Sequence, residues 1–160
     1  MISLLLALTL SPPLPHQQHP MPAAEQPATL MTGLGSLHHP IATKSAEAQK
    51  FSNQGLTFIY AFNHDEAIRA FRRAAELDPA SPMPHWGIAL ALGPNINLPV
   101  DPERELAAYE AAQHARMLAA SAPAIERAYV DAIVTRYSND PKADLDALAV
   151  QYKDAMKAVT

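Results

Sequence analysis

The chain has 160 residues, of which 49% are apolar and 18% charged, and it contains no cysteine. This apolar share is ample for a core, which excludes disorder of the whole chain. The 16 acidic side chains outnumber the 12 basic ones, so a nucleic-acid partner is not expected. Without cysteine there is no disulfide, no thiolate zinc site and no thiol nucleophile. Aromatic residues make up only 6% of a chain rich in alanine, which predicts packed helices rather than sheets.

Residues 1–43 differ from the rest of the chain in composition. Seven of the 15 prolines lie in the first 40 residues, and Glu25 is the only charged residue before Lys44. Proline restricts the backbone and removes a hydrogen-bond donor, so no regular helix is expected there. These residues are therefore predicted to form a disordered, proline-rich leader.

The leader begins with an apolar run over residues 1–10 that has the form of a secretory signal peptide. The run is too short to span a bilayer, and no lysine or arginine precedes it. We expect an exported, periplasmic protein whose mature chain has no integral membrane span. A cytoplasmic location is the alternative.

From Thr43 onward the pattern is helical, without the alternation that is typical of strands. Apolar residues recur at steps of three and four, and residues that cap helices separate the runs. The sequence predicts six helices, which begin near Thr43, Asn63, Met83, Asp101, Ser121 and Asp140.

Bulky and small residues recur along these helices at fixed offsets counted from Ala48. The small residues let two helices approach closely, and the large ones fill the space between them. The offsets resemble those of the tetratricopeptide repeat, a helix pair of about 34 residues. Gln54 departs from the pattern, because leucine is usual at its position. The residues that carry the resemblance are Phe51, Gly55, Phe58, Ala67, Phe71, Ala74 and Pro79.

The resemblance extends over about residues 44–158 and weakens along the chain. Its units are residues 48–81, 82–120 and 121–158, and the second has an enlarged turn between its helices. The resemblance implies an all-α fold, an α-solenoid of about three antiparallel helix pairs. This domain would cover residues 44–160, after the leader.

Residues 61–67, together with His85, Trp86 and Gly87, are similar to a group of exported bacterial tetratricopeptide proteins that are usually longer. The chain is therefore expected to be an N-terminal piece. A solenoid needs a polar outer face on its terminal helix, whereas the last helix here ends with Met156 and Val159 among its apolar residues. We expect an exposed apolar flank on this helix, through which the chain could self-associate.

The resemblance implies a scaffold for protein–protein interaction that binds a peptide or protein segment on its concave face. Neither enzymatic activity nor a cofactor is expected. Asn53 could hydrogen-bond a peptide backbone. Trp86 could anchor a ligand or fill the space between the first two units, and the second role is typical of aromatics at helical spacing. The repeat would place on this face Gln49, Ser52, Asn53, Met83, Trp86 and Leu90.

A metal-handling protein is the alternative function. The chain has seven histidines, and imidazole can bind copper or zinc without any thiolate. No pair of histidines has the His-x-x-x-His spacing on one helix, and an imidazole in a turn can also serve packing or capping. The candidate ligands are His38, His39, His64 and His85.

Overall fold

The computed structural model describes residues 27–95 and 101–159. The regular structure of those ranges is helical, which confirms the all-α prediction. The signal-like run and the rest of the leader up to residue 26 lie outside the described residues. The helices are α1 (Ala46–Tyr60), α2 (His64–Leu77), α3 (Met83–Leu92), α4 (Pro102–Leu118), the short 3₁₀ helix η2 (Ala119–Ser121), α5 (Ala124–Val134) and α6 (Leu145–Lys157).

Polar side chains cap four of these helices at their N-termini. Ser45 Oγ accepts a hydrogen bond from the Ala48 N–H at 3.1 Å, and Asp101 and Asp144 cap α4 and α6 in the same way. Each cap satisfies one of the backbone donors that the first helical turn leaves free. The predicted start of the last helix at Asp140 was wrong, because its carboxylate instead accepts from the Lys142 N–H in a local turn.

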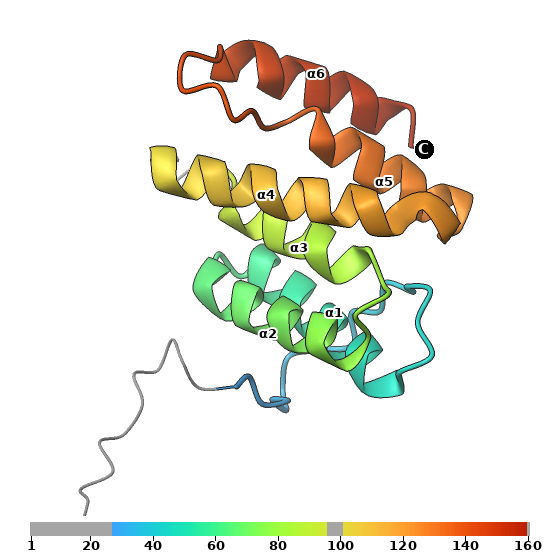
Figure 1. The fold of residues 1–160 in the computed structure, drawn as a ribbon. Coiled ribbons are helices and arrows are strands. Elements are labelled where there is room, and N and C mark those ends of the chain that lie inside the picture. Colours follow the sequence, from blue (N-terminus) through green and yellow to red (C-terminus); the bar gives the residue numbers. More distant parts are fainter. Residues whose placement is uncertain (1–26, 96–100, 160) are drawn as a thin grey trace, which may run out of the picture.

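Each helix packs against the next one along the chain, as Figure 1 shows. In addition, α3 contacts both α1 and α5, so that these three helices form a row. The helices that precede and follow α3 in the sequence, α2 and α4, both pack against it. Side chains of α1, α3 and α5, which are far apart in the sequence, can therefore lie on one surface.

The core between the first three helices is built around one phenylalanine. Phe71 of α2 is 1% exposed, and its ring fills the space next to Gly55 and Gly87. A Cβ atom on Gly55 would lie 2.7 Å from the Phe71 Cζ, which is too close for a real contact. Ala67 and Ala74 on α2 are fully buried as well. The small residues thus allow the close approach that the large ring requires.

The last helix, α6, packs mainly along α5, and none of its residues is buried. Leu145 and Val150 on it are 46% and 51% exposed. In the described ranges no helix combines the length and the apolar character needed to cross a bilayer.

Candidate functional site

The candidate site is the surface of α1, α3 and α5 together with the chain that precedes α1. Residues 27–44, which we call the N-terminal segment, contain no helix. The beginning of the segment packs against α1 and α2, and its later part lies along α1, α3 and α5. Sequence analysis predicted a disordered leader as far as residue 43. In the structure, by contrast, residues 31, 39 and 41 of this segment are hydrogen-bonded to side chains of α1. The difference arises because helix side chains supply partners for the backbone of the segment.

Two amide side chains of α1 hold the middle of the N-terminal segment. Gln49 Oε1 accepts a hydrogen bond from the Ile41 N–H (2.9 Å), and Gln49 Nε2 donates one to the His39 carbonyl (2.8 Å). Asn53 Oδ1 accepts from the His39 N–H at 3.1 Å and from Gln49 Nε2 at 2.9 Å. Since Ile41 lies beside Gln49 and His39 lies beside Asn53, this stretch of the segment runs antiparallel to α1.

Gln54 and Arg69 hold the beginning of the N-terminal segment. Gln54 Oε1 accepts from the Met31 N–H at 2.8 Å, and its Nε2 donates to the Thr29 carbonyl at 3.0 Å. Arg69 Nη2 donates to the Pro27 carbonyl at 3.4 Å. The buried side-chain amide of Gln54, at a position where leucine is usual, thus forms hydrogen bonds with two backbone groups that would otherwise bind water. The partners of Gln54 and Arg69 are main-chain groups, so these contacts do not depend on the side chains of the segment.

An aromatic pocket of about 280 Å³ lies next to Asn53, and His39 of the N-terminal segment lines it. The His39 ring stacks on Trp86 with centroids 6.4 Å apart and planes inclined by 20°. Tyr129 meets both rings edge-on at 5.6 Å. Such an arrangement of rings is favourable and suits a planar ligand group. The remaining residues of the lining are Leu56, Ile59, Tyr60, Leu90, Tyr152 and Met156.

Two buried polar atoms at this site lack a hydrogen-bond partner in the described part of the chain. One is Nε1 of Trp86, a side chain that is 6% exposed. The other is Oε2 of Glu126 in α5, a side chain that is 4% exposed and whose Oε1 accepts from the Ala42 N–H. A buried polar atom without a partner costs about 1–3 kcal/mol. The N-terminal segment therefore does not use all the hydrogen-bonding capacity of the surface on which it lies.

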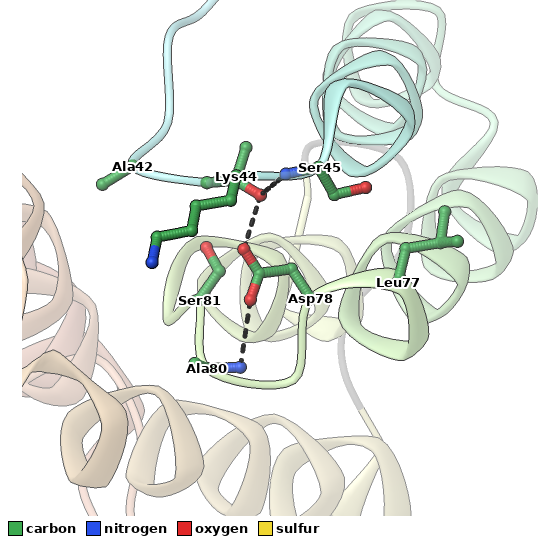
Figure 2. A pocket seen from close by; sticks show the side chains of 8 residues that line it. Ala42, Lys44, Ser45, Leu77, Asp78, Ala80 and Ser81 are labelled. Carbon is green, nitrogen blue, oxygen red and sulfur yellow. Dashed lines mark hydrogen bonds between the residues drawn. The ribbon is translucent and has the colours of Figure 1, made fainter.

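A larger hollow, of about 660 Å³, lies where the N-terminal segment joins α1. Figure 2 shows the Asp78 carboxylate between the chain at Ser45 and the turn at Ala80. Asp78 Oδ2 accepts from the Thr43 hydroxyl at 2.5 Å, and Oδ1 accepts from the Ala80 N–H at 3.3 Å. Thr43 Oγ1 also accepts from the Ser45 N–H at 3.1 Å. These bonds attach the end of the segment to the turn between α2 and α3. The residues that line the hollow therefore hold the segment in place.

The residues expected on the concave face fall into two sets. Ser52 and Met83 are buried in the packing of the helices, so they support the surface from within. The others contact the N-terminal segment or line the aromatic pocket: Gln49, Asn53, Trp86 and Leu90.

The histidines considered as metal ligands have separate surroundings. His38 Nδ1 lies 3.1 Å from Asn53 Nδ2, and the ring of His39 lies in the aromatic pocket. The ring of His64 lies 6.2 Å from that of Phe62, at the start of α2. Throughout residues 27–95 and 101–159, no group of three or more histidines and carboxylates is arranged to hold a metal ion.

The fourth of these histidines, His85 of α3, forms a pair with His114 of α4. Their ring centroids are 4.0 Å apart. Burial, together with the neighbouring charge of His114, lowers the pKa of His85 from 6.5 to about 4. His85 is therefore neutral near pH 7 where it contacts α4.

Sequence analysis missed the contributions of α5 and α6 to this site. Tyr129, Glu126 and Tyr152 lie in the third unit, where the resemblance is weakest. Nothing in the sequence places Tyr129 next to Trp86.

Comparison with known proteins provides no family for this chain. A scan of protein-family models, a search of curated proteins and a search of solved structures found no significant match. The geometry of the residues described above therefore carries the functional conclusion.

Proposed function

We propose that this chain is a protein-interaction scaffold that binds an extended peptide segment on the surface of α1, α3 and α5. In this proposal the helices form a solenoid of about three tetratricopeptide-like pairs, and the chain has no catalytic activity of its own. The observation that supports the proposal most directly is the pairing of Gln49 and Asn53 with main-chain groups of residues 39 and 41, a stretch that contains no helix.

The chemistry of the surface agrees with such a ligand. Amide side chains both donate and accept, so they can pair with the N–H and the carbonyl of a peptide at the same time. The aromatic pocket beside them, with Trp86 and Tyr129, offers a place for one bulky side chain. Main-chain hydrogen bonds then provide affinity, and the pocket provides selectivity.

The location of binding is the sharpest test of this proposal. Linear peptides are selected from a displayed random library against the full chain, resynthesised with a photoreactive group and crosslinked. We expect the crosslinks, mapped by mass spectrometry, to fall on α1, α3 and α5. Crosslinks confined to α2 and α4, or a library that yields no binder, would contradict the proposal.

A pair of matched variants adds a second measurement. Leu90→Glu places a charge in the aromatic pocket, whereas Met117→Glu places the same charge on α4, where the methionine is exposed. We expect Leu90→Glu to weaken a selected peptide by about 10-fold or more, and Met117→Glu to leave its affinity unchanged. Thermal unfolding of both variants shows whether the loss reflects the pocket or the fold.

A further inference from the structure

We infer that the N-terminal segment is a tethered internal ligand of this surface, and that an external partner must displace it. The partner that fits is an extended peptide with an aromatic or imidazole ring at the place that His39 occupies. This inference rests on the proposed function and adds to it the class of partner and a competitor within the chain.

The backbone contacts make such an exchange possible. Gln49 and Asn53 bind the N–H and the carbonyl of His39 and the N–H of Ile41. Any extended peptide carries such groups on residues that lie two positions apart. The amides of α1 therefore bind the internal segment in a way that they could repeat with a second chain.

The ring of His39 supplies an aromatic contact that depends on a side chain of the segment. It stacks on Trp86 and meets Tyr129 edge-on, and it forms part of the wall of the aromatic pocket. A partner that is to replace the segment must fill the same space, which a ring does and a small side chain does not.

The internal segment is an imperfect ligand, which makes its displacement reasonable. In the described ranges it leaves Nε1 of Trp86 and Oε2 of Glu126 buried without a partner. A partner that pairs either atom would recover free energy that the segment does not provide.

The covalent connection of the N-terminal segment to α1 determines how strongly the segment competes with an external peptide. Residues 43–45 join the segment directly to α1, so its local concentration at the surface is high, on the order of millimolar. An external peptide binds only the fraction of molecules in which the segment is released, and its apparent affinity falls by that fraction. A change that weakens the internal contact must therefore strengthen external binding.

This relation defines the experiment. The probe is a fluorescent synthetic peptide with the sequence of residues 27–44, and its anisotropy is titrated with three full-length chains. These are the natural chain, His39→Ala, which removes the ring, and Ser36→Ala, a control in an exposed part of the same segment. We expect His39→Ala to bind the probe about 10-fold more tightly than the other two chains. A probe in which alanine replaces histidine at position 39 should bind His39→Ala about 10-fold more weakly than the unaltered probe.

The outcomes separate this inference from the proposed function. Equal, saturable binding of the probe by all three chains would overturn the inference and leave the proposed function in place. If none of the chains binds the probe, the segment is not a ligand of this surface and the inference is wrong, while the crosslinking experiment still decides the proposed function.

Hydrogen exchange of the natural chain provides an independent measurement. We expect the N–H groups of Met31, His39 and Ile41 to exchange slowly, because each is hydrogen-bonded to a side-chain amide of α1. A selected external peptide in excess should accelerate their exchange. Exchange at the rate of an unstructured peptide in the absence of any ligand would overturn the inference.

Discussion

The ring of Phe71 lies against Gly87, at the place where a side chain on Gly87 would have to lie. Gly55 of α1 faces the same ring from the other side, and its Cβ would lie 2.7 Å from the Phe71 Cζ. One aromatic ring of α2 thus fixes the distance of closest approach for both α1 and α3. These are the helices that carry the amides and the indole of the candidate site.

The first prediction follows from this contact. Gly87→Ala adds a methyl group where the Phe71 ring lies, so the ring must move or α3 must shift. Alanine favours a helix more than glycine does, but overpacking of a core costs about 1–3 kcal/mol, which outweighs that gain. We expect a net loss of stability in urea unfolding followed by circular dichroism. In a Phe71→Leu background, which makes room at this site, the same change should cost less. An unchanged unfolding midpoint for Gly87→Ala would show that the ring can move freely.

A second prediction concerns Tyr137, which joins the chain after α5 to α3. Its hydroxyl donates to the Ala89 carbonyl at 2.7 Å, and burial raises the pKa of the phenol. Tyr137→Phe removes this bond, although the Gly93 N–H still donates to the Ala89 carbonyl. We therefore expect a loss of only about 1 kcal/mol in the free energy of unfolding.

The control for this substitution is Tyr60→Phe, because Tyr60 is 70% exposed. Its unfolding curve should superimpose on that of the natural chain. Equal curves for Tyr137→Phe and the natural chain would mean that the buried bond adds nothing to stability.

The third prediction is a loss of stability in acid that depends on His85. The pKa of this side chain is lowered from 6.5 to about 4 in the folded protein, by burial and by His114. Below pH 6.5 the unfolded chain binds a proton that the folded chain does not bind until about pH 4, so stability falls across that window as the pH falls. The ring is only half-buried and solvent screens part of the effect, so we expect a loss of about 1 kcal/mol.

Urea unfolding at several pH values between 4 and 7 measures this loss. His85→Gln should flatten the pH dependence, and His114→Gln should reduce it in part, because one of the two causes of the shift is removed. If the free energy of unfolding changes equally with pH in the natural chain and in both variants, other groups cause the acid sensitivity.

The packing of the first three helices could be predicted from the sequence, because it depends on side-chain size at regular spacing. Phe51, Phe58 and Phe71 are buried, Ala67 is fully buried, and Gly55 lies against the Phe71 ring. Size and period are local properties of a sequence, so they can be recognised without knowing which segments meet.

The N-terminal segment could not be predicted in the same way. Its proline content indicates that it has no helix, which is correct for the described residues, but composition does not reveal partners elsewhere in the chain. Gln54 pairs with residues 23 and 25 positions earlier, and Glu126 pairs with Ala42 across 84 positions. A pattern within one helix carries no information about contacts over such separations. The unusual glutamine at position 54 was the one local signal, and its meaning required the structure.

The fourth prediction uses Trp86, the only tryptophan in the chain, as a reporter of the N-terminal segment. The indole is 6% exposed, and the His39 ring stacks on it. If His39→Ala releases the segment from the pocket, water reaches the indole, so its fluorescence should shift to longer wavelength and acrylamide should quench it more strongly. Ser36→Ala should leave both properties unchanged, because position 36 is exposed. Identical spectra and quenching for the natural chain and His39→Ala would mean that the indole is shielded by the helices alone, and that the His39 ring does not cover it.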